Sequence, residues 1–327
     1  MTNTKIIGTG SYLPEKIMTN DDWAKIVDTS DEWITSRTGI KERHFASDQQ
    51  ATSDLVVEAA KEAIKDAGIE SSEIDLIIVA TITADNAYPS TANWVQKKMG
   101  LKPVPSFDIG AACSGFLYAL IMADSLIKTG VAKTALIAGA ETMSKVINWK
   151  DRNTCVLFGD GAGAAVLRSS ENEDDGILST YWGADGNLGD LLMQPAGGSA
   201  MPASEETVAN KLHTVHMKGN EVFKHAVLRM QEAAMKSLEL AGLTGEDVDL
   251  FIPHQANMRI IEATIRRAKI PMEKTFVNID KIANISAATI PIALDHARKE
   301  GRLKEGDNAL LAAFGAGFTW GGAVVRF

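Results

Sequence analysis

The sequence has only two cysteines, Cys113 and Cys155, among 327 residues. This number excludes a disulfide framework and is compatible with a reducing cytosol. The sequence also lacks a run of about 18 apolar residues that could span a membrane, and residues 1–17 lack the basic-then-apolar layout of a signal peptide. Positive charge is in deficit, with 33 Lys and Arg against 42 Asp and Glu. We therefore expect a soluble cytoplasmic protein without a membrane segment or a nucleic-acid partner.

Apolar β-branched runs alternate along the chain with amphipathic helical stretches, a pattern typical of an α/β fold. Residues 53–67 are predicted to form a helix that Thr52 or Ser53 caps and Gly68 ends. Buried strands are predicted at residues 74–80, 134–138, 164–167, 249–252 and 310–313.

One helix–glycine–strand signature occurs twice. Ala67-Gly68-Ile69 followed by Glu73-Ile74-Asp75-Leu76 matches Ala241-Gly242-Leu243 followed by Asp247-Val248-Asp249-Leu250, 174 residues later. The repeat predicts a duplicated fold, with halves at residues 1–175 and 176–327. Residues 184–214 are rich in Gly, Pro and Ser and are expected to form a surface excursion or linker.

Two glycine clusters do not fit a nucleotide-binding loop. In the first, which begins Gly8-Thr9-Gly10, Leu13 occupies the third glycine position of a dinucleotide fingerprint. The second, Gly159-Asp160-Gly161-Ala162-Gly163, precedes a predicted strand, whereas a phosphate site needs a helix N-terminus. Tight-turn packing is the expected role of this second cluster.

Cys113 follows a run of small residues and precedes a long, nearly all-apolar helical stretch. A helix N-terminus carries partial positive charge, so this position favours thiolate over thiol. A thiolate is a nucleophile suited to covalent catalysis on an acyl group. The alternative is that Cys113 is simply a small core residue.

Two further polar residues stand at places where α/β proteins form sites. His254 ends a predicted buried strand, and Asn284 precedes the apolar helix predicted at residues 290–297, where it could also act as an N-cap. The C-terminal run Phe314-Gly315-Ala316-Gly317-Phe318 follows another strand. Its backbone N–H groups could point into a cavity and form an oxyanion hole.

Together these motifs resemble β-ketoacyl-acyl-carrier-protein synthase III, a condensing enzyme of fatty-acid synthesis. They are Ala-Ala-Cys113-Ser-Gly-Phe, Pro-His254-Gln-Ala-Asn, Asn284-x-Ser-Ala-Ala and the terminal Phe-Gly-x-Gly-Phe-Thr-Trp-Gly, supported by Thr29-Ser30-Asp31-Glu32-Trp33-Ile34 and Arg37-Thr38-Gly39-Ile40. The resemblance covers the whole chain. It implies the thiolase fold, a five-layered αβαβα architecture of two similar halves.

The resemblance also implies a reaction. Cys113 takes an acyl group from acyl-CoA, and malonyl-acyl-carrier-protein then loses CO₂ and condenses with it. His254 and Asn284 donate hydrogen bonds to the enolate oxygen, while the backbone N–H groups of Cys113 and Ala316 hold the second oxyanion. Acyl-CoA is a substrate here, and no metal or other cofactor is expected.

The resemblance also implies which residues of this sequence bind CoA and the acyl carrier protein. The residues implied for CoA are Thr29, Trp33, Arg37, Arg152, Phe223 and Asn257. Those implied for the acyl carrier protein are Lys224, Gln255, Ala256, Asn257, Met258, Arg259, Arg266 and Arg267. The three arginines recur at a spacing that places them on one helix face, which suits an acidic partner and is also typical of a solvated face. Tyr88 is expected to reach the acyl pocket of the partner in a homodimer.

Three residues depart from the family pattern: Ile285 stands where Thr is usual, Ala316 where Gly is usual, and Tyr88 where Phe is common. Primer length, branching and pathway are therefore not predicted. Two other functions stay open. The first is a cysteine hydrolase with a Cys-His-Asn triad, and the second is a catalytically silent homologue that serves as a scaffold.

Overall fold

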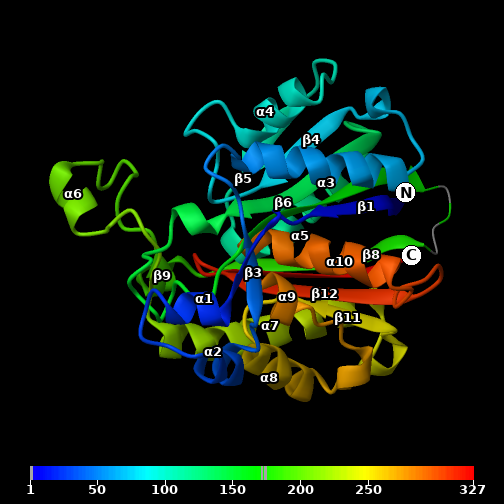
Figure 1. Cartoon of the computed structure of the whole chain (residues 1–327). Coiled ribbons are helices and arrows are strands. Elements are labelled where there is room, and N and C mark those ends of the chain that lie inside the picture. Colours follow the sequence, from blue (N-terminus) through cyan, green and yellow to red (C-terminus); the bar gives the residue numbers. More distant parts are fainter. Residues whose placement is uncertain (1–2, 171, 173–174) are drawn as a thin grey trace.

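The computed structural model describes residues 3–170, 172 and 175–327. Two β-sheets lie between layers of helices, with one helical layer enclosed between the sheets and one outside each sheet (Figure 1). This is the five-layered αβαβα arrangement expected of a thiolase-like fold. None of the helices in the described part of the chain is long and apolar enough to cross a membrane.

The first sheet has strand order β1-β7-β6-β4-β5, with β4 parallel to β5 and β6 and the other pairs antiparallel. Its strands are β1 (Asn3–Tyr12), β4 (Leu76–Ala80), β5 (Ser106–Ile109), β6 (Thr134–Thr142) and β7 (Asp160–Ser170). Helices α3 (Thr52–Asp66) and α4 (Thr91–Lys98) cover its outer face.

The second sheet has order β11-β12-β13-β8, in which only β11 and β12 pair in parallel. Its strands are β8 (Gly176–Ala184), β11 (Leu250–Pro253), β12 (Asn308–Gly315) and β13 (Thr319–Arg326). Helices α7 (Gly219–Ala241) and α8 (Met258–Ala268) cover it from outside. The strands of the first sheet precede residue 175 and those of the second follow it; the halves as separate domains stay a prediction.

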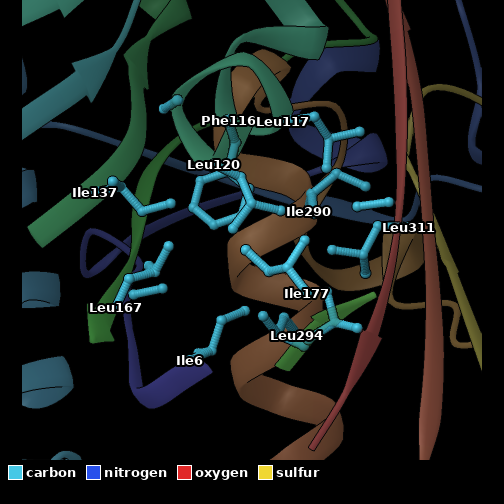
Figure 2. Close-up of a cluster of buried hydrophobic side chains, with 14 of the residues drawn as sticks. Ile6, Phe116, Leu117, Leu120, Ile137, Leu167, Ile177, Ile290, Leu294 and Leu311 are labelled. Carbon is cyan, nitrogen blue, oxygen red and sulfur yellow. The ribbon is translucent and has the colours of Figure 1, made fainter. Parts of the chain in front are cut away.

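Helices α5 (Gly115–Lys128) and α10 (Thr289–Lys299) form the central layer. Their apolar side chains meet those of both sheets in a single buried cluster (Figure 2). In this cluster Phe116 and Leu120 of α5 lie near Ile290 and Leu294 of α10, with Leu311 of β12 on one side. The core therefore fixes the starts of α5 and α10 relative to each other.

The remaining elements are short. They are β2 (Lys16–Thr19), β3 (Glu42–Phe45), β9 (Leu192–Met193), β10 (His216–Met217), α1 (Asn20–Ala24), α2 (Asp31–Thr38), α6 (Glu205–Ala209) and α9 (Ile279–Ile282), with 3₁₀ turns η1 (Ser71–Glu73), η2 (Ala112–Ser114), η3 (Met143–Lys145), η4 (Gly186–Leu191), η5 (Gly245–Asp247), η6 (Met272–Lys274) and η7 (Ser286–Ala288).

The repeat seen in the sequence is also a repeat in the structure. Gly68 and Gly242 both have positive φ after a long helix, and η1 with β4 corresponds to η5 with β11 at the same spacing of 174 residues. The spacing extends to the central layer, where η2 before α5 corresponds to η7 before α10. Ala112 and Ser286, at equivalent places, have φ values of +44° and +46°.

Several local predictions were wrong in detail. Helix α3 is preceded by Ala51 at its N-cap, because the Thr52 hydroxyl donates to the Thr83 carbonyl and the Ser53 hydroxyl to Asp85 instead. The glycine cluster does not form a tight turn, since Gly161 and Gly163 lie within β7. A Cβ on Gly163 would lie 2.6 Å from the backbone N of Ile292, so this glycine lets α10 pack closely on the strand.

The stretch at residues 184–214 has two roles. Figure 1 shows α6 projecting away from the layers, as expected of a surface excursion. Residues 192–194, which precede α6, lie against the body of the protein. There Leu192 lines two cavities beside Cys113, and Gln194 lines one of them.

Candidate active site

Cys113 lies in η2, immediately before α5, and its side chain is 9% exposed. The backbone of β12 passes directly beside it: a Cβ on Gly315 would lie 2.6 Å from the backbone N of Cys113. The end of β12, before the C-terminal turn, thus lies against the backbone of Cys113. The oxyanion role of the turn stays a prediction.

The thiol itself is not the resting thiolate that we expected. Burial raises the pKa of Cys113 to about 12, although the neighbouring Ser286 side chain acts in the opposite direction. A helix N-terminus contributes about 0.3–2 kcal/mol to a nearby anion, roughly one pKa unit. This is less than the effect of burial. Cys113 is therefore a thiol at rest, and it needs a proton acceptor when it reacts.

His254 follows β11 and is 1% exposed. Its backbone N–H donates to the Ala312 carbonyl at 2.8 Å, and its Nδ1 lies 2.5 Å from Oγ1 of Thr289 on α10. Burial lowers the pKa of His254 to about 3. The imidazole is therefore neutral near pH 7, with Nδ1 occupied by Thr289.

The amide of Asn284 is held by its own chain. Its Oδ1 accepts from the Ser286 N–H at 2.8 Å, while its backbone N–H donates to Leu157 and its carbonyl accepts from Gly159. Asn284 does not cap α10, because Ala288 is the N-cap of that helix. With Oδ1 engaged, Nδ2 is the group left to donate to a ligand. Ile285 is fully buried and leaves this hydrogen bond intact.

Two cavities meet at Cys113. The first, of about 300 Å³, is lined by His254 and Asn284 near Cys113 and by Trp33 and Arg37 farther along. The second, of about 310 Å³, is lined mainly by apolar side chains, with Ser286 and Ala316 among its walls. Cys113 therefore lies between a cavity that also contains polar side chains and a mainly apolar one.

Comparison with known proteins agrees with this geometry. Family models described as 3-oxoacyl-[acyl-carrier-protein (ACP)] synthase III and its C-terminal region match residues 107–186 and 238–327. A β-ketoacyl-[acyl-carrier-protein] synthase III of Caldanaerobacter subterraneus subsp. tengcongensis is 56% identical over 98% of this chain and 97% of its own. The chain belongs to the 3-oxoacyl-[acyl-carrier-protein] synthase III family. It is accordingly an acyltransferase of the condensing class that initiates fatty-acid synthesis.

Solved structures of the family have the same fold. The synthase III of Aquifex aeolicus is 51% identical, with a TM-score of 0.91, and covers 99% of this chain and 100% of its own. The Pseudomonas aeruginosa enzyme is 40% identical, with a TM-score of 0.92, and covers 99% of this chain and 98% of its own. The catalytic and binding roles of single residues are not given by these likenesses and stay predictions.

The residues predicted for CoA gather mostly at the outer end of the first cavity. The guanidinium carbons of Arg37 and Arg152 lie 4.5 and 5.2 Å from the ring centre of Trp33. Phe223 and Asn257 line the cavity walls. Arg152 and Thr29 are not among the lining residues. Arg152 donates to the Asp28 carbonyl, and Thr29 lies before α2 with its hydroxyl buried and unpartnered among the described residues.

One predicted carrier-protein contact is wrong. Gln255 is fully buried, donating to the carbonyls of Pro253 and Phe276 and accepting from the Asn278 N–H. It therefore joins β11 to the loop before α9 and presents no surface to a partner. Ala256 and Asn257 line the first cavity instead.

The basic residues predicted for the carrier protein are exposed and partly clustered. Lys224 of α7 and Arg266 and Arg267 of α8 line one surface groove. Arg259 lies nearer the start of α8 and donates to the Ser36 carbonyl of α2. Met258 is half-buried, with its Cβ against Gly39.

The structure also shows where Ala316 and Tyr88, the two other residues that differ from the family pattern, are located. Positive φ in the C-terminal turn falls on Gly317, at +138°, and not on Ala316, so alanine fits there. Tyr88 is 87% exposed and lies outside the lining of both cavities of its own chain.

Sequence reasoning missed three polar residues of the site: Glu141, Ser286 and Thr289. Glu141 is fully buried at the end of β6, where it accepts from the Ser286 hydroxyl. The signal was present, since a carboxylate ends an apolar strand there, as His254 ends β11. Ser286 was quoted as part of a motif without a role, and Thr289 adjoins that motif.

Proposed function

We propose that Cys113, His254 and Asn284 divide a decarboxylative condensation into two half-reactions. In the first, the Cys113 sulfur attacks the thioester carbonyl of an acyl-CoA, and CoA leaves. The position of Cys113 at the junction of the two cavities carries this proposal. The channel suits an extended pantetheine arm, and the apolar pocket suits the acyl chain that stays on the sulfur.

In the second half-reaction, malonyl-acyl-carrier-protein enters the emptied channel and loses CO₂. The negative charge then develops on the thioester oxygen, which a neutral His254 and the Nδ2 of Asn284 can stabilise by hydrogen bonds. The resulting carbanion attacks the acyl carbonyl on Cys113, and we propose that the backbone N–H groups of Cys113 and Ala316 bind that oxyanion. Loss of CO₂ drives this bond formation, so we propose that no metal or other cofactor takes part.

The remaining assignments are proposals of the same kind. Trp33, Arg37 and Arg152 form a cationic aromatic cluster suited to the adenine and phosphates of CoA. We propose a cytoplasmic homodimer, for which the free, buried state of both cysteines and the exposed Tyr88 are the supporting observations. Sedimentation of the protein should give a dimer mass, and Tyr88→Glu should raise the monomer fraction.

The deciding experiment combines the protein with acetyl-CoA and malonyl-acyl-carrier-protein. We expect acyl-Cys113 by intact mass after the first substrate and a 3-oxoacyl product after the second. Cys113→Ala should lose both. Release of free acetate without a new carbon–carbon bond would identify a hydrolase, and the absence of acylation would identify a scaffold.

A further inference from the structure

Glu141 is a buried carboxyl group for which the condensation described above has no use. It lies at the end of β6 and is fully buried. Its Oε2 accepts from the hydroxyls of Thr81 at 3.2 Å and Thr83 at 2.5 Å and from the backbone N–H of Ile82 at 3.2 Å. Its Oε1 accepts from the Ser286 hydroxyl at 3.1 Å.

In this environment the pKa of the carboxyl group lies near neutral pH, so that it can both accept and release a proton there. Burial raises the pKa of Glu141 to about 7, while the hydrogen bonds from Thr83, Ile82 and Ser286 act against burial. These contacts come from neutral groups on the segment after β4 and on η7. The titratable side chain that faces Glu141 is Cys113 on η2, whose pKa is raised in turn by the nearby carboxylate.

Ser286 connects the two titratable groups. Its hydroxyl donates to Glu141 at 3.1 Å. Ser286 also lines the second cavity together with Cys113, and its side chain lowers the pKa of the Cys113 thiol. The left-handed backbone at Ser286, with φ of +46°, turns the chain so that the residue lines the acyl pocket beside Cys113. The hydroxyl of Ser286 therefore lies between the buried thiol and the buried carboxylate, bonded to the carboxylate and beside the thiol.

We propose that Glu141, through Ser286, accepts the Cys113 proton during acylation and returns it after condensation. The inference rests on the proposed function, in which Cys113 is acylated. As the new carbon–sulfur bond forms, the Cys113 proton passes to the Ser286 oxygen, and the Ser286 proton passes to Oε1 of Glu141. The bond from the acyl carbon to the CoA sulfur breaks, and CoA leaves as a thiolate that takes a proton from water.

The second half-reaction returns the proton that Glu141 accepted in the first. Collapse of the tetrahedral intermediate breaks the bond between the acyl carbon and Sγ and releases Cys113 as a thiolate. Glu141 then returns the stored proton through Ser286, which restores the thiol and the carboxylate. One proton from solvent is consumed per turnover, and it leaves on CoA.

His254 is poorly suited to this task. A general base is most effective when its pKa lies near the working pH, and burial lowers the pKa of His254 to about 3. Its Nδ1 is held by Thr289, and its other nitrogen serves the malonyl thioester. Proton transfer from Cys113 and charge stabilisation on malonate are thus assigned to different groups.

The test is single-turnover acylation of Cys113 by acetyl-CoA, measured by intact mass from pH 5.5 to pH 8.5. In the unaltered protein the rate should rise with pH through about 7, because only the Glu141 carboxylate accepts a proton. In Glu141→Gln the acylation rate should fall about 10²-fold, and its increase with pH should disappear. Decarboxylation of malonyl-acyl-carrier-protein, measured separately as CO₂ release, should be retained.

Three companion variants separate a proton relay from a structural role. Glu141→Asp should restore part of the rate and the pH dependence. Ser286→Ala keeps the backbone N–H that donates to Oδ1 of Asn284. It should nevertheless lower the acylation rate as much as Glu141→Gln does. The double variant should acylate no more slowly than either single variant. Thr83→Val removes a hydrogen bond that lowers the pKa of Glu141, so the rise should move to higher pH.

The outcomes are distinguishable. Failure of the unaltered protein to form acyl-Cys113 would overturn the proposed function itself. Normal acylation with an unchanged pH profile in Glu141→Gln would overturn the relay alone. Equal losses in acylation and decarboxylation would also overturn it, as would an unmoved profile in Thr83→Val.

Discussion

Single buried groups set the chemistry at the scale of residues. Cys113 and His254 are pushed by burial toward their neutral forms, so neither is charged at rest near pH 7. Each must therefore meet its reacting partner through hydrogen bonds that are already in place. In the proposed reaction, the site stabilises charge only where and when it develops.

A first prediction concerns His254 and Asn284. His254→Ala and Asn284→Asp should each lower malonyl decarboxylation about 10²–10³-fold, the usual effect of losing one oxyanion donor, while acyl transfer to Cys113 changes far less. CO₂ release and intact mass measure the two steps. Asn284→Asp keeps the Oδ1 that accepts from Ser286, so the local backbone is preserved. Equal losses in both steps would contradict the division of roles.

A second prediction concerns pH. Because burial lowers the pKa of His254 to about 3, the imidazole gains its proton only as the pH falls toward that value. The decarboxylation step should therefore show no inflection from His254 between pH 5 and pH 8. Rates of CO₂ release across this range measure it. An inflection near pH 6.5, the usual value for histidine, would show that His254 is solvated during catalysis.

Close backbone contacts position the catalytic turns at the scale of elements. A Cβ on Gly139 of β6 would meet the Ala287 carbonyl of η7, in the turn that carries Ser286. Gly139→Ala should cost about 1–3 kcal/mol of unfolding free energy and reduce acylation of Cys113. Gly110→Ala is the matched control, because nothing lies within 4 Å of its added methyl group. Urea unfolding measures both; equal stability would indicate that η7 can move without cost.

The groove between α7 and α8 gives a fourth prediction. Reversing the charge of Arg266 or Arg267 should raise KM for malonyl-acyl-carrier-protein about 5- to 10-fold, an effect of roughly 1 kcal/mol, and leave acylation by acetyl-CoA unchanged. Steady-state kinetics at two salt concentrations measure the effect, which should shrink at high salt. Lys236→Glu on α7, an exposed lysine paired with Glu239, is the control. A similar rise for that variant would exclude a specific docking surface.

At the scale of the whole molecule, polar contacts join α10 of the central layer to β1 of the first sheet. Asp295 of α10 is 1% exposed and accepts from the hydroxyls of Thr9 at 3.1 Å and Ser11 at 2.5 Å, both on β1. Asp295→Ala should lower the unfolding free energy by about 1–3 kcal/mol, because the buried Thr9 hydroxyl and the half-buried Ser11 hydroxyl lose their acceptor. Asp295→Asn keeps one acceptor oxygen and should lose less. The midpoints of urea unfolding decide, and an unaltered midpoint in Asp295→Ala would contradict the argument.

The parts of the molecule that the sequence revealed are those with local signals. His254 ends an apolar run and Cys113 and Asn284 each precede one, and the repeated glycine signature indicated the duplication. Contacts between distant segments were not accessible: Glu141 meets Ser286 across 145 residues, and Gly163 serves a helix far along the chain. The prediction for Gln255 was wrong because two of its three hydrogen-bond partners, Phe276 and Asn278, lie on a distant loop outside its own motif.

The matched turns η2 and η7 have a consequence for stoichiometry. At the spacing of 174 residues, Cys113 in the first copy corresponds to Ala287 in the second, and the two turns lie together beneath one pair of cavities. The symmetric scaffold thus has a thiol in one copy and a methyl group at the matching place in the other. In the proposed reaction, the first copy carries the acyl group on Cys113, and the second contributes the Ser286 hydroxyl and the Asn284 amide. Each chain is then expected to load one acyl group at a time, and neither copy could replace the other.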